Sequence, residues 1–187
     1  MDDVQIVNLY WERDEKALIE TDIKYGRYLK KISHNILSQD EDVNECVNDT
    51  YMRAWNSMPS QRPSRLGVYL GKIVRGISID LLRKKGAEKR GGRQYTVSLS
   101  ELSECVDGSP SAEEKMNDKL LGEAVSKYLY SLPAESRTVF ICRYFFCDSI
   151  EDIAKCRGCS QSKIKSLLFR TRKGLKAFLE SEGFFNE

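Results

Sequence analysis

SIEDIAKCRGCSQSKIKSLLFRTRKGLKAF, residues 149–178, is the stretch that decides the fold of the C-terminal part of this chain. Ser149 predicts the N-cap of a short helix, because its side-chain oxygen can accept a hydrogen bond from a backbone N–H of the first turn. Gly158 predicts the turn that follows, since a residue without a Cβ adopts a positive φ easily. Ser160 predicts the N-cap of a second, longer helix. The stretch is therefore typical of a helix-turn-helix.

The second of these helices is predicted to have one apolar and one basic face. At 100° per residue, Ile164, Leu168 and Leu175 fall on the same side. From Lys163 to Lys176 there are six basic residues and no acidic one. Such a helix can enter a major groove of DNA, with its first turns at the base edges and its later side chains on phosphates. The residues predicted to contact DNA are Ser160, Ser162, Lys163, Lys165, Ser166, Phe169, Arg170 and Lys173.

Phe169 is an aromatic residue on the polar face of this helix. Contact with the methyl group of a thymine would explain its position. Packing against a neighbouring element of the protein would explain it equally well. The sequence alone leaves both interpretations open.

The remainder of the chain also has helical periodicity, without the alternation that indicates strands. Apolar residues recur at helical spacing from Ile6 to Leu37, with one break. A further helix is expected from about Asp40 to Met58-Pro59, and another from Val68 towards Gly91-Gly92. Helices are also expected through Leu120–Leu129 and over Glu135–Phe146. We therefore predict an all-α fold.

Residues 91–110 have weak periodicity and contain Gly, Ser and a short acidic stretch, which is typical of a linker. Ser111 and Glu114 have the spacing of a capping box that would start the next helix. We expect two small helical domains, residues 1–90 and 113–187, joined by a flexible linker at 91–112.

The net charge conceals an uneven distribution. The chain has 187 residues with 30 Lys+Arg and 28 Asp+Glu, a formal net charge of +2. The net charge is −5 over residues 1–60, +8 over 61–95, −5 over 96–125 and +4 over 126–187. Because a polyanion responds to local potential, two basic blocks separated by acidic ones favour two anionic contact sites over simple solvation of helix faces.

Several stretches resemble the extracytoplasmic-function (ECF) sigma factors. LPAESRTVF (132–140), SIEDIA (149–154) and residues 163–172 resemble region 4 of that family. NDTYMRAW (48–55) resembles its region 2.2, while YLGKIVR (69–75) and IDLLR (79–83) resemble its regions 2.3 and 2.4. The resemblance covers both halves of the chain in the family's order, which makes it more specific than either motif alone.

The resemblance implies an initiation subunit of bacterial RNA polymerase, with no enzymatic activity of its own. Region 4 would recognise the −35 promoter element as duplex, and region 2 would capture a base of the −10 element as the strands part. The implied partners are core RNA polymerase, through its clamp helices and flap, promoter DNA and an anti-sigma factor. The implied location is cytoplasmic. The residues at the positions that contact the clamp are Glu45, Asn48, Asp49 and Arg53.

The resemblance also implies that the loop from Ser60 to Leu66 holds the extruded base. The residues predicted to contact DNA in this half are Ser60, Gln61, Arg62, Arg65, Lys72, Arg75, Arg83 and Lys84. Trp55 and Tyr69 are expected to be core aromatics rather than wedges that separate the strands. Gly76 stands where the family often has Asn, so the −10 preference is expected to differ. Asn48 stands where the family usually has Gln, so the clamp contacts are expected to be rearranged.

Two other functional classes have weaker support. An enzyme is disfavoured because the chain has no phosphate-binding glycine loop and no GxSxG motif, and its single histidine is His34. The acids between Asp40 and Glu45 could hold a nuclease metal, but a partner-facing surface is the simpler interpretation. A stand-alone helix-turn-helix regulator would leave the basic block at 62–93 without a role. We expect no cofactor, no metal, no small-molecule substrate and no membrane insertion, because no apolar run approaches about 18 residues.

The spacing Cys156-x-x-Cys159 suggests a zinc or redox site. The chain has no second CxxC, and Cys142 and Cys147 are distant in sequence, so a four-ligand zinc site has little support. We interpret both cysteines as small buried hydrophobic residues of the helix-turn-helix. A thiol switch is the alternative.

Overall fold

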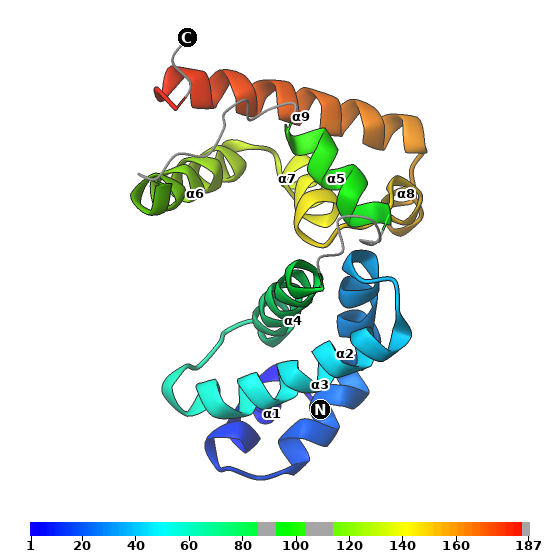
Figure 1. The fold of residues 1–187 in the computed structure, drawn as a ribbon, viewed down its shortest axis with the longest axis vertical. Coiled ribbons are helices and arrows are strands. Elements are labelled where there is room, and N and C mark those ends of the chain that lie inside the picture. Colours follow the sequence, from blue (N-terminus) through cyan, green and yellow to red (C-terminus); the bar gives the residue numbers. More distant parts are fainter. Residues whose placement is uncertain (86–92, 104–113, 185–187) are drawn as a thin grey trace. The chain divides into compact units, whose positions relative to one another are not determined.

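The protein is helical throughout the residues that its computed structural model describes, which are 1–85, 93–103 and 114–184 (Figure 1). The all-α fold class predicted from periodicity is confirmed. The chain forms two compact units, Met1–Tyr95 and Thr96–Glu187. None of the described helices combines the length and the apolar composition that crossing a membrane requires.

The N-terminal unit is built from four α-helices. They are α1 (Asp3–Trp11), α2 (Lys16–Ile36), α3 (Asp40–Ser57) and α4 (Leu66–Lys84), with the short 3-10 helix η1 (Met58–Ser60) after α3. Helices α2, α3 and α4 pack against one another, and α1 packs on α2. The predicted break between Ile6 and Leu37 is confirmed, since α1 ends four residues before α2 begins. The core is formed by apolar side chains that recur at helical spacing, among them Ile6, Tyr10, Leu29, Ile32, Ile36, Val43, Val47, Leu70 and Val74.

Asp3 ties three elements of this unit together. Its Oδ1 accepts hydrogen bonds from Tyr25 Oη at 2.5 Å and from Lys24 Nζ at 2.6 Å, both on α2. Its Oδ2 accepts one from the backbone N–H of Leu66 at 3.2 Å, at the first residue of α4. Burial works to raise the pKa of Asp3, but these hydrogen bonds and the charge of Lys24 outweigh it and leave that pKa lowered. The start of α4 is therefore held against α1 and α2.

The C-terminal unit contains the helix-turn-helix. Its elements are α5 (Arg93–Ser103), α6 (Glu114–Ser131), α7 (Ala134–Phe140), the π-helical turn η2 (Ile141–Phe145), α8 (Ile150–Arg157) and α9 (Gln161–Ser181). Helix α9 packs against α6, α7 and α8. The unit has its own core, in which the buried side chains are Ala124, Val139, Phe140, Tyr144, Ile153, Ala154, Ile164, Leu168, Leu175 and Leu179.

The helix ends predicted for the helix-turn-helix are confirmed. Ser149 Oγ accepts a hydrogen bond from the backbone N–H of Asp152 at 3.0 Å, and Ser160 Oγ accepts one from that of Lys163 at 3.2 Å. Gly158 is left-handed, with φ 60°. Each N-cap satisfies a backbone donor that the helix itself cannot pair, which fixes where α8 and α9 begin.

Residues 93–103 differ from the expectation, because they form helix α5 instead of part of a flexible linker. Glu101 of α5 accepts two hydrogen bonds from Arg143, at 2.7 Å from Nη2 and 3.2 Å from Nε. Periodicity missed this helix because an ion pair with η2 attaches it to the unit as much as apolar packing does. The predicted capping box at 111–114 begins outside the described residues.

Arg143 is the largest buried side chain of the unit, with 2% of its surface exposed. Its Nη1 donates to the carbonyl oxygen of Asp148 at 2.9 Å, and Tyr144 Oη donates to Glu101 Oε2 at 3.0 Å. Burial raises the pKa of Glu101, but Arg143, Tyr144 and Arg172 outweigh it, so that pKa is lowered. Glu101 is therefore held ionised beside a buried guanidinium.

Two glycines give a matched prediction about stability. Gly76 lies inside α4, where an added Cβ would meet no atom within 4 Å. Gly76→Ala should raise the free energy of unfolding of the N-terminal unit by about 0.5–1 kcal/mol, because alanine loses less backbone entropy in a helix. Gly158→Ala should instead lower that of the C-terminal unit by about 1–2 kcal/mol, since φ is positive there. Urea unfolding of each variant checks both signs, and equal effects would contradict the assignment.

Candidate nucleic-acid interface

Helix α9 presents a continuous polar face to solvent. Ile164, Leu168 and Leu175 lie on its buried side, as the sequence predicts. The exposed side chains on the other side are those of Gln161, Ser162, Lys163, Lys165, Ser166, Phe169, Arg170 and Lys173. Ser160, at the N-cap, is also exposed but uses its hydroxyl to cap the helix. The eight residues predicted at this interface therefore lie on one helix and its cap, within reach of a single groove.

Lys163 differs from the other basic residues of this face. Its Nζ lies 2.7 Å from Glu135 Oε1, at the start of α7. The hydrogen bond from Lys163 and its charge lower the pKa of Glu135, and the same contact raises the pKa of Lys163. Both side chains are exposed, so the pair contributes little to stability. Its effect is to offset one positive charge at the beginning of the recognition helix.

Phe169 is 60% exposed, so packing against a neighbouring element does not explain its place on the polar face. Of the two interpretations that the sequence leaves open, this one is therefore excluded within the described residues. An exposed aromatic ring on a helix that is otherwise polar on this side is available to contact a base.

The loop between η1 and α4 is anchored against α1. Ser60 Oγ donates to the carbonyl oxygen of Ser57 at 3.0 Å at one end, and Leu66 is bound to Asp3 at the other. Between these ends, Arg62 Nη2 donates to Asn8 Oδ1. The Arg62 guanidinium also lies 5.4 Å from the centroid of the Trp11 ring, within the range of a cation–π contact. The loop is thus held in place, and Gln61 and Arg65 in it are exposed.

The basic residues predicted to contact DNA in this unit do not form one patch. Lys72 and Arg75 lie in the first half of α4, and Arg83 and Lys84 lie in its last turn. At 1.5 Å per residue, Lys72 and Arg83 are about 16 Å apart along the helix axis. The loop end of α4 and its C-terminal end are therefore two separate basic positions.

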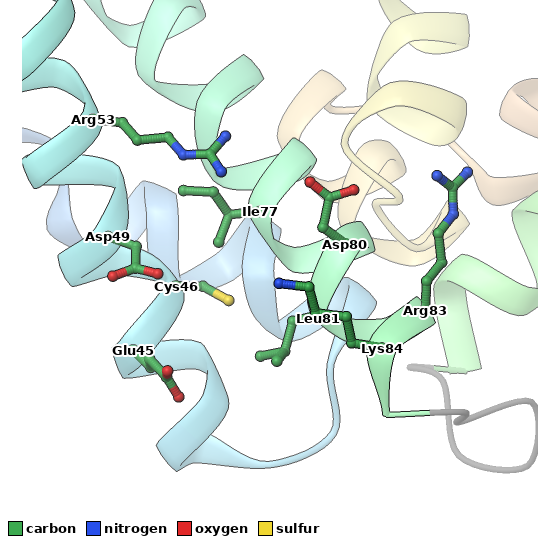
Figure 2. A pocket seen from close by; sticks show the side chains of 9 residues that line it. All are labelled: Glu45, Cys46, Asp49, Arg53, Ile77, Asp80, Leu81, Arg83 and Lys84. Carbon is green, nitrogen blue, oxygen red and sulfur yellow. The ribbon is translucent and has the colours of Figure 1, made fainter.

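The C-terminal end of α4 and helix α3 enclose a groove of about 380 Å³ (Figure 2). Three of the residues predicted to contact polymerase line it from α3, namely Glu45, Asp49 and Arg53. Two of the residues predicted to contact DNA, Arg83 and Lys84, line it from α4 together with Asp80. Cys46, Ile77 and Leu81 supply its apolar part. The structure therefore brings together residues that the sequence analysis assigned to two different partners.

Figure 2 shows the Arg53 and Lys84 side chains pointing into the space between α3 and α4. Among the residues that the structure describes, none of the six charged side chains of this groove is engaged in an ion pair or a side-chain hydrogen bond. Unpaired charges of both signs around an apolar floor are available to a partner that has charges of its own.

Asn48 lies apart from the other three residues predicted to contact polymerase. It lines a second groove, between α2 and α3, together with Leu18, Ile19, Ile23, Val47 and Tyr51. Ile19 and Ile23 are 61% and 74% exposed, and Met52 of α3 is 54% exposed. Exposed apolar side chains gathered in this way are typical of a protein-binding surface.

Trp55 and Tyr69 are half-buried and packed, in agreement with the expectation that they are structural aromatics. The Trp55 ring lies 6.1 Å from the centroid of Tyr10, and the Arg13 guanidinium lies 4.3 Å from the Trp55 centroid. Tyr69 Oη and Ser57 Oγ are 2.6 Å apart and hydrogen-bonded. Both rings thus stiffen the unit that holds the loop.

The interpretation of both CxxC cysteines as buried residues was wrong for one of them. Cys159 is partly buried and packs against the core of the C-terminal unit, but Cys156 is exposed. Cys156 follows the buried Ala154 by two residues, and two residues turn a helix by 200°, so its side chain points away from the core. Among the described residues, no three His, Cys, Asp or Glu side chains gather as a metal site would require.

Four residues that shape these surfaces were missed. Asn8 and Trp11 hold the loop at Arg62, Glu135 pairs with Lys163, and Glu101 pairs with Arg143. The exposed tryptophan at the end of the first amphipathic helix was the only signal among them. The others depend on contacts between residues 28 to 54 positions apart, which no local pattern reveals.

Comparisons with known proteins agree with the two-unit arrangement. Residues 23–88 match the family described as Sigma-70 region 2, and residues 122–175 match Sigma-70, region 4. The chain is 25% identical over 159 residues to the ECF RNA polymerase sigma factor SigM of Bacillus subtilis, covering 82% of this chain and 91% of that protein. It is 26% identical over 169 residues to the RNA polymerase sigma factor SigV of the same species, covering 89% and 94%.

Two further matches have lower identity or lower coverage. The ECF RNA polymerase sigma factor SigE of Mycolicibacterium smegmatis is 22% identical over 157 residues, which cover 80% of this chain and 56% of that longer protein. The structure of CnrH in complex with the cytosolic domain of CnrY matches with 21% identity and a TM-score of 0.43, covering 97% of this chain and 99% of that one.

The two regions occur in the family's order, one in each unit, and the relatives that match over most of the chain are sigma factors of the same group. Members of this family direct the initiation of transcription and are not enzymes. The chain therefore belongs to the sigma-70 family as an ECF RNA polymerase sigma factor with regions 2 and 4.

Proposed function

We propose that this sigma factor recognises the −35 element as duplex DNA through helix α9. The observation that supports this most strongly is the exposed polar face of α9, which has four basic residues of the predicted set and no acid. Lys165 and Ser166, in the first turns, are suited to base edges, and Arg170 and Lys173 to phosphates. Phe169 would contact a thymine methyl group.

For the −10 element, the proposed contact is the anchored loop at residues 60–66. Capture of an extruded base costs unstacking energy of a few kcal/mol, which a preformed pocket can offset by hydrogen bonds and stacking. The contacts from Arg62 to Asn8 and Trp11 support this role, because a loop held by the protein loses less entropy on binding. Gln61, Arg65, Lys72 and Arg75 would hold the displaced strand, and this contribution would weaken as salt is added.

Core RNA polymerase is the proposed partner of helix α3. Glu45, Asp49 and Arg53 in the groove of Figure 2 would form charged contacts with it. Asn48, with the exposed Ile19 and Ile23, would form a second, more apolar part of the same interface. Polar and apolar parts side by side are usual in a protein interface. Contact of the C-terminal unit with the polymerase flap is part of the proposal.

The domain assignment stays a proposal, with residues 1–90 as the region 2 domain and 113–187 as the region 4 domain. A cytoplasmic location and an anti-sigma partner are proposed on family membership. The exposed apolar groove at Ile19 and Ile23 is a surface that an anti-sigma protein could cover, and it would then compete with polymerase.

A transcription assay tests the proposed function. Purified chain added to core polymerase over a promoter library should give transcription from a defined set of promoters, and neither component should do so alone. A stand-alone helix-turn-helix regulator would instead bind operators specifically and independently of polymerase. Specific binding by the chain alone, with no effect on initiation, would therefore overturn the proposal.

Lys165→Ala should weaken binding of the reconstituted holoenzyme to promoter DNA by about 1–2 kcal/mol, roughly tenfold in Kd. The loss should depend on an intact −35 element, because α9 contacts only that element. Competition binding of holoenzyme to DNA with a wild-type or a scrambled −35 element measures it. Lys155→Ala is the matched control, since Lys155 is exposed on α8 and pairs with Glu151. Loss of core binding by Lys165→Ala would contradict the assignment.

Glu135→Gln should strengthen binding of the holoenzyme to promoter DNA, because it releases Lys163 from its ion pair. One more phosphate contact makes the slope of log K against log salt steeper by about 1. Titrations at several salt concentrations measure this slope. The double variant Glu135→Gln/Lys163→Ala should show no such gain, and a gain that persists in it would place the effect elsewhere.

Asp49→Ala should weaken binding to core polymerase by about 1–3 kcal/mol while leaving the fold intact, because Asp49 is exposed and unpaired in the groove. Fluorescence titration of the labelled chain with core enzyme measures the affinity. Glu12→Ala removes an exposed acid at the end of α1 and should bind normally. Equal loss in both variants would show a general effect of charge instead of a contact.

A further inference from the structure

Helix α5 lies outside both family matches, which cover residues 23–88 and 122–175. It nevertheless docks on the C-terminal unit through one of its faces. Ser98 is 2% exposed, and Leu102 packs against the core of that unit. Val97 and Leu99, on its other side, are exposed. One buried and one exposed face are typical of a helix that belongs to the unit it packs on.

Glu101 fastens this helix to two other elements of the unit. It receives two hydrogen bonds from Arg143 of η2, as described above, and one from Tyr144. Its Oε2 also lies 3.6 Å from Arg172 Nη1, on the recognition helix α9. Arg172 Nη1 in turn donates to Tyr144 Oη at 2.7 Å. Figure 1 shows α5 beside this part of the unit.

Undocking of α5 would remove this carboxylate from beside a buried guanidinium. Removing one partner of a buried pair is strongly unfavourable, because the other charge remains without compensation. The docked state is therefore expected to dominate in the free protein.

The docked position of α5 limits how far the two units can separate. Seven residues, 86–92, lie between Lys85 at the end of α4 and Arg93 at the start of α5. At up to 3.6 Å per residue, this segment spans at most about 29 Å. If α5 were not attached, the next helix would be α6 at Glu114, and 28 intervening residues could span up to roughly 100 Å.

We propose that helix α5, fastened by Glu101 to Arg143, is a clasp that shortens the connection between the two units and so restricts the spacing of the two promoter elements that this sigma factor can bridge. Each base pair adds about 3.4 Å along the duplex, so a shorter connection excludes longer spacers. The promoter part of this proposal rests on the proposed function. The clasp itself does not, because it concerns the free chain.

Distances in the full chain test the clasp directly. Spin labels introduced as non-canonical amino acids at Glu12 and Glu180, both exposed, report the separation of the units by pulsed EPR. Glu101→Ala and Ser98→Glu should each add a population at distances beyond the longest seen in the wild type. Val97→Asp, on the exposed face of α5, is the matched control and should leave the distribution unchanged.

Hydrogen exchange separates undocking from unfolding. The α5 amides should be protected in the wild type and lose protection in Glu101→Ala and Ser98→Glu, while α9 stays protected. Unchanged distances in both variants, or α5 amides that are unprotected in the wild type, would overturn the clasp. If Glu101→Ala also exposes α9, Ser98→Glu decides the outcome, because it leaves the Arg143 carboxylate partner in the chain.

Transcription over templates with spacers of graded length tests the consequence, with each variant normalised to its best template. The wild type should be active over a narrow range, and Glu101→Ala and Ser98→Glu over a wider one. Equal ranges despite longer distances would overturn the link to promoter spacing. Absence of transcription by the wild type on every template would overturn the proposed function and leave the distance result standing.

Discussion

The buried guanidinium of Arg143 is the constraint on which the C-terminal unit depends. A cation with 2% of its surface exposed must be compensated inside the protein, because transfer of an unpaired charge from water costs many kcal/mol. Glu101 provides this compensation from α5, more than 40 residues earlier in the chain. The same carboxylate lies near Arg172 and Tyr144, so one interaction connects α5, η2 and the recognition helix.

The N-terminal unit solves a comparable problem with Asp3. That carboxylate accepts hydrogen bonds from α2 and from the first residue of α4, and so sets where the loop at residues 61–65 begins and ends. In both units, an acid near the start of the unit's chain positions an element that faces a partner. Lowered pKa values for Asp3 and Glu101 follow from the same cause, which is hydrogen bonding to the ionised form in a partly buried place.

The net charge of +2 describes neither unit well. The α3–α4 groove has acids and bases around an apolar floor, whereas the exposed face of α9 is basic. Within α9, Glu135 offsets the charge of Lys163, so the basic residues are not equivalent. Local potential, and not the sum, decides what each surface can bind. The alternation of charge along the chain is thus partly retained on the surfaces of the folded units.

Much of this protein follows from local physics. Hydrophobic spacing predicted the all-α fold, and Ser149, Gly158 and Ser160 predicted the ends of α8 and α9, because caps and turns depend on residues within a few positions. The motifs indicated the sigma family for the same reason, since each lies within one helix. The buried side of α9 was also predictable from a period of 3.6 residues.

Other features required the tertiary structure. The sequence treated residues 93–103 as linker, Cys156 as buried and Asn48 as a neighbour of Asp49 in one site. The structure has a docked helix, an exposed thiol and two separate grooves in these places. It also pairs Lys163 with Glu135 across 28 positions. The physical reason is common to all four: which face of a helix is covered depends on elements distant in sequence, and periodicity contains no information about them.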